Sequence, residues 1–544
     1  MKWEILNKNT KDIIKSLLEN RNLKTKKEID EFINPKDPID IKFKDLGISS
    51  VTIKKVLKRL EKAKKNKEKI IIFGDYDADG VCATAILWET MYKLGFDVLP
   101  FVPDRFVDGY GFKTSSFENN KLQITNYKLV ICVDNGIVAH EAIKKAKELG
   151  IDVIVVDHHT KGSKKLATDY ILHSTAVCGS ALAWFLALEV SDKVGPSKSA
   201  SKRSDLNSSL DLVALGTIAD QMPLLEINRS LVKFGLPELL KTKRLGLQSM
   251  LKDLKLDNVG AYEVGFMIAP RINAMGRLKS ATDALRFLCT RDPKKAEDLN
   301  RLLNETNIER QKIVDEVVTR VLEETSDEDR VIVVSGSYHE GVIGLASGKI
   351  TEKYYKPSIV LSIGKKISKA SARSINGFNI IEAIKETELI IEGGGHPMAA
   401  GFSIETNRIS DFRSKINELA QNTLTDEILD RKLKIDLVIN FAEIDTELVE
   451  VLKTFEPTGQ GNYSPVFMSK NVKVKEVKPV GQEGKHLKLK LEQNGIIIDA
   501  IYFGGSANDQ KLKANDVVNC AYAIEENTWN SKTSIQLKIK DIKI

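Results

Sequence analysis

An apolar stretch that runs directly into three alternating aspartates constrains this 544-residue chain more than any other feature. Residues Ile70–Phe73 predict a short buried strand, and Asp75, Asp77 and Asp79 follow it ahead of a helical pattern over 81–94. Open α/β sheets place their sites at the carboxyl ends of parallel strands. Carboxylates crowded there are costly unless a cation neutralises them. An Asp-rich surface turn is the alternative, so the rest of the chain must decide.

Size and composition indicate a multidomain protein outside the membrane. At roughly 100–200 residues per domain, the length predicts about three or four domains. No run approaches the ~20 apolar residues of a membrane span, and the N-terminus lacks the pattern of a secretory signal. The five cysteines are scattered and form no C-x-x-C pair, which disfavours a zinc ribbon or a disulfide framework. We therefore expect a cytoplasmic protein.

The net charge of +7 is mild, but one basic stretch stands out. Lys54 to Lys69 contains nine Lys or Arg and two Glu. Such a run is either the solvated face of a helix or a contact to a phosphate backbone, and the sequence leaves both open.

The order of apolar runs predicts the architecture. Between residues 51 and 225 short β-branched runs alternate with helical stretches, which is typical of a doubly wound, mostly parallel sheet. A charged helix over 294–324, on the order of 45 Å long, leads to a second α/β block. In the tail, His486–Glu492 alternates strictly before Asn494-Gly495, which predicts a β-hairpin within a small barrel.

Further acidic and imidazole side chains directly follow apolar runs of the first block. Asp134 follows one run, His158 and His159 follow another together with Asp157, and Asp220 ends a later one that we also take as a strand. A lone histidine is more often a core or capping residue, but two of the seven occur here. Carboxylates and imidazoles without a thiolate suit Mn²⁺ or Mg²⁺. There are enough ligands for two ions, an arrangement used for phosphate ester hydrolysis.

These segments resemble the motifs of the DHH phosphoesterase superfamily and its DHHA1 companion domain. The matching segments are Asp75–Gly80, Asp134–Gly136, Asp157–His159 and Gly216–Asp220, with Gly393–Gly401 for DHHA1. Two more segments, Arg271–Arg277 and Tyr338–Gly344, and the β-rich tail are similar to the branch of single-strand-specific 5′→3′ DNA exonucleases. Phe73 stands where many shorter relatives carry a histidine, which points away from the pyrophosphatase branch.

The resemblance implies a domain order for the whole chain. The expected segments are an N-terminal helical segment (1–50), a DHH catalytic domain (51–293), a connecting helix (294–328), a DHHA1 domain (329–425), a linker (426–464) and an OB-like nucleic-acid-binding domain (465–544).

The resemblance also implies a role for each motif residue. Asp77, Asp79, Asp134, His158 and Asp220 match the ligands of two divalent ions, with Asp134 as the bridge and a catalytic residue. His159 would face the scissile phosphate as an electrophile or proton donor. Asp75 and Asp157 would support the ligands.

Donors to the DNA phosphates are expected mainly from the second block. The candidates are Arg105, Arg271, Asn273, Arg277, Ser371, Arg373, Gly394, Gly395 and His396. An Arg fork binds phosphate in a bidentate fashion, and backbone N–H groups of a glycine-rich turn form an anion-binding concavity. Each Arg could equally form a surface ion pair, and the glycine run could be only a tight turn.

The tail carries 13 Lys and 9 Asp or Glu after residue 464, with the aromatics Phe467, Tyr502, Tyr522 and Trp529. This suits an OB fold acting as a platform for single strands, although the aromatics could instead form its core.

The resemblance implies a metal-dependent 5′→3′ exonuclease that degrades single-stranded DNA to mononucleotides in DNA repair and recombination. It would act as a monomer, with a helicase and a single-strand-binding protein as candidate partners. Two alternatives stay open at this point. One is a hydrolase of short RNA oligonucleotides or cyclic dinucleotides, which the β-rich tail disfavours. The other is a replication scaffold with an inactive site, which the intact Asp and His set disfavours.

Overall fold

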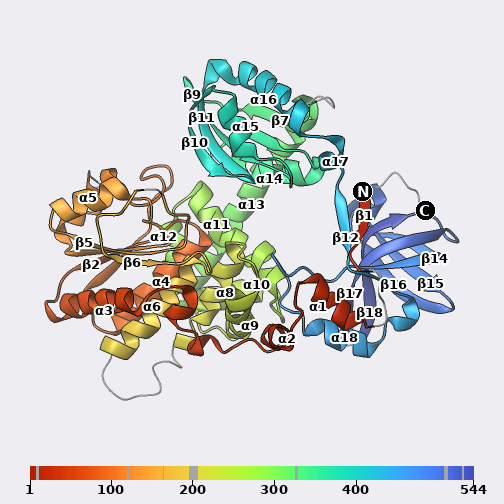
Figure 1. Ribbon diagram of the computed structural model, residues 1–544, viewed down its shortest axis with the longest axis horizontal. Helices are drawn as coiled ribbons and strands as arrows, with labels where there is room; N and C mark the ends of the chain where they lie inside the picture. The colour runs from red at the N-terminus through yellow and green to blue at the C-terminus, as the bar shows by residue number, and fades with distance from the viewer. Residues whose placement is uncertain are drawn as a thin grey trace. The chain divides into compact units, whose positions relative to one another are not determined.

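The computed structural model describes residues 1–7, 12–118, 122–162, 164–194, 206–324, 329–507, 512–529 and 532–544. Two compact units account for the chain. One comprises Ile41–Asp220 and Phe234–Arg431 and holds both α/β blocks (Figure 1). The other is assembled from Met1–Asp40, Gln221–Lys233 and Lys432–Ile544. Among the described residues, no helix combines the length and apolarity needed to cross a membrane.

The first block is built on a five-stranded parallel sheet of order β3-β2-β4-β5-β6. Its strands are β2 (Ile70–Phe73), β3 (Val98–Phe101), β4 (Leu129–Val133), β5 (Asp152–Asp157) and β6 (Tyr170–His173). Helices cover both faces: α5 (His140–Glu148) lies on one, and α3 (Ser50–Lys65) and α6 (Gly179–Val194) lie on the other (Figure 1). The predicted doubly wound sheet is confirmed. Because all strands are parallel, their carboxyl ends meet at one edge.

The apolar run before Asp220 is a helix and not the strand that the sequence predicted. Helix α8 spans Leu210–Ala219, and Asp220 is its C-cap residue. Leu212, Val213, Ala214 and Leu215 are all buried, so this helix is apolar around its whole circumference. A short continuous apolar run is compatible with either a buried strand or a buried helix, which explains the error.

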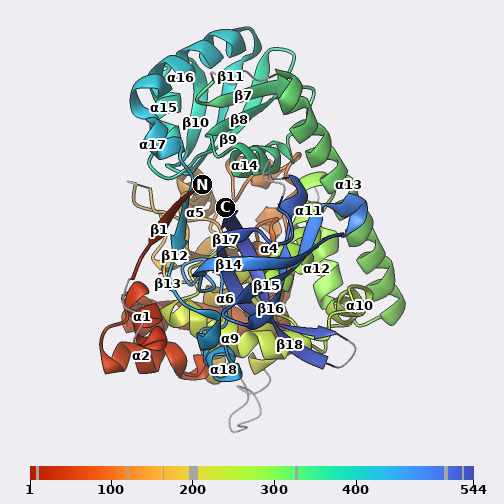
Figure 2. The same ribbon diagram turned by 90° about the vertical axis from the view of Figure 1, so that its right-hand side faces the viewer.

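A series of helices leads from the first sheet to the second. These are α9 (Glu226–Leu240), α10 (Leu245–Asp253), a π-helical stretch (Glu263–Ile268), α11 (Ala269–Leu278), α12 (Ala281–Cys289) and α13 (Pro293–Glu324). Figure 2 shows α13 running from the region of α10 and α12 up to β7 of the second sheet. Its 32 residues correspond to about 48 Å, and its apolar residues Leu303, Val317 and Val321 are buried.

The second block carries a mixed five-stranded sheet of order β10-β11-β9-β8-β7. Its strands are β7 (Ile332–Gly336), β8 (Ser358–Ser362), β9 (Ile367–Arg373), β10 (Ile390–His396) and β11 (Ala399–Glu405). The helices are α14 (Ile343–Tyr354), α15 (Ile380–Glu386), α16 (Ile409–Thr423) and α17 (Asp426–Leu429). The glycines expected to form an anion-binding turn lie instead in β10, where Gly394 pairs with Gly401. The hairpin turn comes later, at Pro397-Met398.

The barrel is formed by β14 (Phe467–Val480), β15 (His486–Gln493), β16 (Ile496–Tyr502), β18 (Lys532–Lys543) and β17 (Val517–Trp529), in that order, with β17 pairing back to β14. Asn494 and Gly495 both have positive φ and form the predicted turn between β15 and β16. Phe467, Tyr502 and Tyr522 belong to the buried core. These aromatics therefore support the fold and do not present a surface to bases, while the side chain of Trp529 lies outside the described set.

The N-terminal helices and the expected linker both pack into the core of this barrel unit. Leu17 of α1 (Ile13–Asn20) and Phe32 of α2 (Lys26–Ile33) share a cluster with Phe441 and Phe455 from the 426–464 segment. The same segment adds β12 (Lys432–Ile435), which pairs with β1 (Lys2–Ile5), as well as β13 (Leu437–Val438) and α18 (Thr446–Lys453).

Arg229, near the start of α9, connects this helix to α2 and to the 426–464 segment. Its Nε donates to Phe32 O at 2.6 Å, and its two terminal nitrogens donate to the carbonyls of Thr454, Phe455, Glu456 and Pro457. The guanidinium also lies 3.9 Å from the Phe32 ring centroid. The side chain is fully buried, and burial lowers its pKa to about 10.

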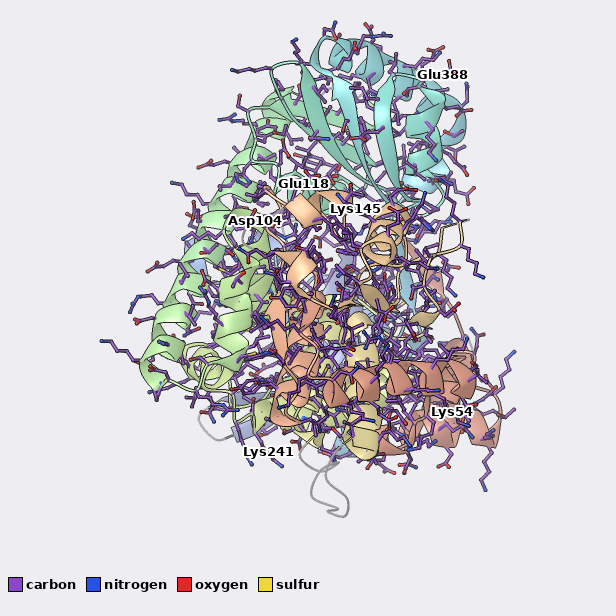
Figure 3. The ribbon with its side chains drawn as sticks, turned by 90° about the vertical axis from the view of Figure 1, so that its left-hand side faces the viewer. Lys54, Asp104, Glu118, Lys145, Lys241 and Glu388 are labelled. Carbon is purple, nitrogen blue, oxygen red and sulfur yellow. The ribbon has the colours of Figure 1, made fainter. Side chains whose placement is uncertain are left out.

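The basic run Lys54–Lys69 forms most of α3, and Lys54 is labelled on that helix in Figure 3. Arg59 is its buried member and pairs with Glu68 and Asp152 at 2.7 and 2.6 Å. None of these residues lines the cavity described below. Within this run, Arg59 thus serves the fold through two ion pairs.

Candidate metal-dependent active site

The strand ends of the first sheet bring the predicted acidic and imidazole residues together. Three groups each place ligand atoms within 4.8 Å of one another. They are Asp75, Asp77 and Asp134; Asp79, His158 and Asp220; and Asp134, His158 and His159. Asp134 and His158 occur in two groups each, so the groups form one continuous cluster. Asp75 lies as close to Asp77 and Asp134 as they lie to each other within this limit, so the distances do not distinguish its role from that of the expected ligands.

Local hydrogen bonds fix the two aspartates that begin α4 (Ala78–Lys93). Asp77 is the N-cap, and its Oδ1 accepts from Gly80 N at 2.9 Å. Both oxygens of Asp79 accept from the first residues of α6, from Gly179 N at 2.7 Å and Ser180 N at 3.0 Å. A helix N-terminus favours a carboxylate in this position. Asp79 therefore connects the cluster to the N-terminal end of α6.

Asp134 has the features expected of a bridging ligand. Its backbone is in the left-handed region (φ 60°), just after β4. Its Oδ1 is buried and accepts no hydrogen bond among the described residues, although His158 Nε2 lies 3.2 Å away. His158 Nε2 also lies 3.6 Å from Asp220 Oδ2. A buried carboxylate oxygen without a donor is costly, and a cation would satisfy it.

His159 is oriented by Asp157, the last residue of β5. Asp157 Oδ1 accepts from His159 Nδ1 at 2.7 Å, and its Oδ2 accepts from Ile137 N at 2.8 Å. Burial opposes the charged imidazole, but Asp157 raises the pKa of His159 to about 9. The other ring nitrogen, Nε2, lies 3.2 Å from the Tyr110 hydroxyl. His159 can thus present a proton toward the cluster.

The electrostatics of the cluster favour cation binding. Burial and the neighbouring carboxylates raise the pKa values of Asp75, Asp77 and Asp134, and they raise that of Asp220 to about 8. Burial lowers the pKa of His158, which keeps its imidazole neutral and able to ligate. Oxygen and imidazole donors without thiolate fit Mn²⁺ or Mg²⁺. The residues present therefore fit a divalent-metal centre.

A glycine beside the cluster offers a test of this assignment. A Cβ at Gly179 would lie 2.6 Å from Asp134 Cγ. We expect Gly179→Ala to displace Asp134 and weaken Mn²⁺ binding about 10–100-fold, as when a residue that orients a ligand is changed. Calorimetric titration with Mn²⁺ measures this. Gly348→Ala is the matched control, because its Cβ would only touch Arg373 Cγ at 4.0 Å. Equal Mn²⁺ affinity in both variants would contradict the assignment.

A cavity of about 530 Å³ opens beside the cluster, within the larger unit. Asp75, Asp77 and His159 line one side, together with Tyr76, Arg105, Phe106 and Tyr110. Residues of α11, of the loop before α14, of α14 and of the second sheet line the rest: Asn273, Gly276, Arg277, Glu340, Gly341, Ile343, Gly344, Lys369, Ala370, Ser371, Arg373 and Gly401. Arg105 and Tyr110 lie in the loop after β3, which also contains Asp104, labelled in Figure 3.

The second wall of the cavity is cationic. Burial and the nearby guanidinium of Arg105 lower the pKa of Arg277 to about 10, and burial lowers the pKa of Arg373. Arg373 donates to Ala372 O at 2.9 Å, and Lys369 lies on the same strand, β9. Cations held this closely favour an anion between them. The cavity therefore has carboxylates and an imidazole on one side and guanidinium and ammonium groups on the other.

The predicted nucleic-acid residues fall into two sets. Arg105, Asn273, Arg277, Ser371 and Arg373 line the cavity. The others, Arg271, Gly394, Gly395 and His396, lie outside its lining. Arg271 donates to Asn304 Oδ1 at 2.6 Å, and the three residues of β10 are exposed on the second sheet.

Sequence reasoning missed residues that only the fold brings to the site. Tyr110 contacts His159, and Asn135 Nδ2 ties β2 to β4 by donating to Phe73 O and Val133 O. Gly179 and Ser180, which hold Asp79, are a hundred residues from it in sequence. Tyr110 lies five residues after Arg105, which the sequence analysis names as a candidate. This proximity in sequence is the signal that could have identified Tyr110.

Family models match three parts of the chain. The DHH family N-terminal domain matches residues 69–217, the DHHA1 domain matches 311–422, and the RecJ OB domain matches 435–541.

Individual proteins match most of the chain. It is 34% identical to the single-stranded-DNA-specific exonuclease RecJ of Bacillus subtilis, covering 97% of this chain and 67% of that protein. It is 30% identical to the Haemophilus influenzae RecJ exonuclease over 90% of each chain. Among solved structures, Thermus thermophilus RecJ in complex with Mn²⁺ superimposes with a TM-score of 0.83 at 26% identity, covering all of this chain and 79% of that one. Another crystal structure of RecJ bound to manganese is 31% identical, with a TM-score of 0.59 over 68% of this chain and 94% of that one.

Proposed function

The chain belongs to the RecJ family, and on that premise we propose that it is a metal-dependent exonuclease specific for single-stranded DNA. The strand is degraded from the 5′ to the 3′ end, with release of mononucleotides. Two divalent ions, Mn²⁺ or Mg²⁺, are bound by Asp77, Asp79, Asp134, His158 and Asp220, and Asp134 is shared between them.

One observation carries the proposal: the acidic cluster and the cationic wall share a single cavity. Asp75, Asp77 and His159 line the same space as Arg277, Ser371 and Arg373. A phosphodiester placed there meets Asp77 of the proposed ligands, with Asp75 and His159, on one side and phosphate-binding donors on the other. A divalent-cation site alone would need only the first wall.

Divalent ions, when bound, stabilise charge on the phosphoryl oxygens and acidify water. The side chains of the protein position the substrate and donate protons. The Ser371 hydroxyl and the Arg373 guanidinium hold a terminal phosphate, and Arg105 and Arg277 hold the next one. His159, kept in place by Asp157, offers its Nε2 proton to the reacting phosphate. Asp75 supports the cluster through Tyr76 N, from which it accepts at 2.7 Å.

The barrel supplies a second contact to the strand. Phe503, just after β16, is 54% exposed, packs edge-on against His486 with centroids 5.1 Å apart, and has Lys538 Nζ 5.8 Å from its centroid. An aromatic ring beside cations is a platform for a base and its phosphate. The proposal further includes a monomeric enzyme of DNA repair and recombination in the cytoplasm, working with a helicase and a single-strand-binding protein. These last features rest on the family resemblance alone.

A long single strand labelled separately at each end tests the proposal. With Mn²⁺ or Mg²⁺ we expect the 5′ label to appear at once as mononucleotide, while the 3′ label stays on long products until late. A blunt duplex and a dinucleotide serve as parallel substrates. Early release of the 3′ label would overturn the polarity. Faster turnover of the dinucleotide than of the long strand would favour an oligonucleotide hydrolase, and binding of a single Mn²⁺ in calorimetry would overturn the two-ion centre.

A further inference from the structure

Two exposed aromatic rings stack on each other on the helical segment that lines the cavity. The Tyr262 and Phe266 ring centroids are 4.9 Å apart with an interplanar angle of 27°. The two side chains are 61% and 70% exposed. Tyr262 precedes the π-helical stretch Glu263–Ile268, which continues directly into α11. Large aromatic surfaces left in water next to a site are typical of a binding surface.

The rings precede, on one continuous helical segment, the α11 residues that line the cavity. Asn273, Gly276 and Arg277 of α11 line the cavity, whereas Tyr262 and Phe266 do not. Phe266 is seven residues before Asn273, which is about two turns and 10 Å along the axis. The π-helical stretch runs directly into α11 without a break. A chain that leaves the cavity along this segment toward its N-terminal end therefore meets Phe266 first and Tyr262 next.

A positive charge accompanies this route. Arg271 lies between Phe266 and Asn273 and donates to Asn304 Oδ1 on α13, a neutral partner. Within the part of the chain that the structure describes, its guanidinium forms no ion pair with a carboxylate. Its Nη1 donates to the carbonyl of Met267, the residue after Phe266, which is also a neutral partner. The charge of Arg271 is thus available to a phosphate, and the stacked rings on the same helical segment suit a base of the same strand.

We propose that Tyr262 and Phe266 form a stacking platform for nucleobases of the strand that extends beyond the cavity, with Arg271 holding its backbone. This rests on the proposed function and deepens it, because it states how the part of the strand awaiting cleavage is held. Bases of any identity present a π face, so the platform would be indifferent to sequence. It would also make binding depend on strand length.

Fluorescence anisotropy with a labelled 20-nucleotide single strand tests the platform, with Ca²⁺ replacing Mn²⁺ to prevent hydrolysis. We expect Phe266→Ala and Tyr262→Ala each to raise the Kd about tenfold, the range found when alanine removes a stacking ring. Phe266→Trp keeps a ring and should restore tight binding. The second substrate is a strand with abasic sites over its interior, on which wild type and alanine variants should bind alike, because no base is left to stack.

Tyr92→Ala is the matched control, because Tyr92 is equally exposed (61%) and lies at the far end of α4 from the cluster. Its Kd should stay at the wild-type value, and thermal melting checks that all variants fold. The platform is overturned if Phe266→Ala binds the normal strand as tightly as Tyr92→Ala, or if its loss is equally large on the abasic strand. Failure of the proposed function looks different: wild-type protein would then neither bind nor digest either strand.

Discussion

Replacing Asp134 with asparagine is expected to abolish hydrolysis and, at the same time, to raise the melting temperature of the metal-free protein. The loss of activity should be roughly a thousandfold or more in kcat, since a lost metal contact removes several kcal/mol of transition-state stabilisation. Asparagine keeps the side-chain shape and tolerates the left-handed backbone at this position. The change therefore removes a charge without forcing the loop to move.

The gain in stability follows from the electrostatics of the cluster. Burial and repulsion from Asp79, Asp77 and Asp75 raise the pKa of Asp134 well above its usual range. A group whose charged form is disfavoured in the fold costs stability at neutral pH, and the neutral amide avoids that cost. With saturating Mn²⁺, the wild type should instead melt at a higher temperature than Asp134→Asn. Wild type gains about 2.7 kcal/mol at a hundred times its Kd, while the variant gains little.

Asp211→Asn is the matched control. Asp211 is equally buried, and burial raises its pKa as well, but it pairs with the buried guanidinium of Arg244, which asparagine would leave with Glu89 as its charged partner. Asp211 Oδ2 accepts from Thr242 at 2.7 Å and from Arg244 Nε at 3.2 Å. This variant should melt at a lower temperature and keep its response to Mn²⁺. If Asp134→Asn kept the full rate with Mn²⁺, or lost as much metal-free stability as Asp211→Asn, the assignment of the centre would be wrong.

Replacing Arg229 with methionine is expected to unfold the barrel unit at a temperature at which the catalytic unit is still folded. Arg229 is fully buried and donates to five main-chain carbonyls from two stretches of chain. Methionine fills similar space but leaves these acceptors unsatisfied, at about 1–3 kcal/mol for each acceptor that water cannot reach. We expect a loss of at least about 4 kcal/mol.

Differential scanning calorimetry should resolve this loss as a separate early transition. Arg229→Lys should restore little, because an ammonium cannot reproduce the planar fork. Arg286→Met is the control, since Arg286 forms an exposed pair with Asp283 at 2.9 Å, and its loss should cost less than about 0.5 kcal/mol. A single transition at the wild-type temperature in Arg229→Met would show that this residue does not hold the unit together.

The acidic site could be predicted from sequence because the physics that places it is local. Each of Asp75, Asp134 and His158 follows a strand directly, and parallel strands end at one edge. Asp220 lies in the cluster as predicted, but it follows a helix and not a strand. The apolar run of α8 is equally compatible with a buried strand, which explains the error. The β10 glycines were assigned to a turn because glycine is common in turns, but pairing with β11 decided their conformation.

What could not be predicted depends on contacts distant in sequence. The carboxylate of Asp79 is held by N–H groups of Gly179 and Ser180. Neither residue type signals such a role. The core aromatics of the tail were ambiguous for a related reason: alternation shows which residues share a face of a strand, but only closure of the barrel shows which face is inside.

The discontinuous build of the barrel unit has a consequence for how the chain is made. Residues 1–40 leave the ribosome long before residues 432–544, yet Leu17 and Phe32 pack against strands from this later segment. At 5–20 residues per second this delay is on the order of half a minute. During that time the apolar faces of α1 and α2 have no partner, so nascent or truncated chains should be substrates for chaperones. The barrel can therefore form only after its last strand, β18 (Lys532–Lys543), has been made.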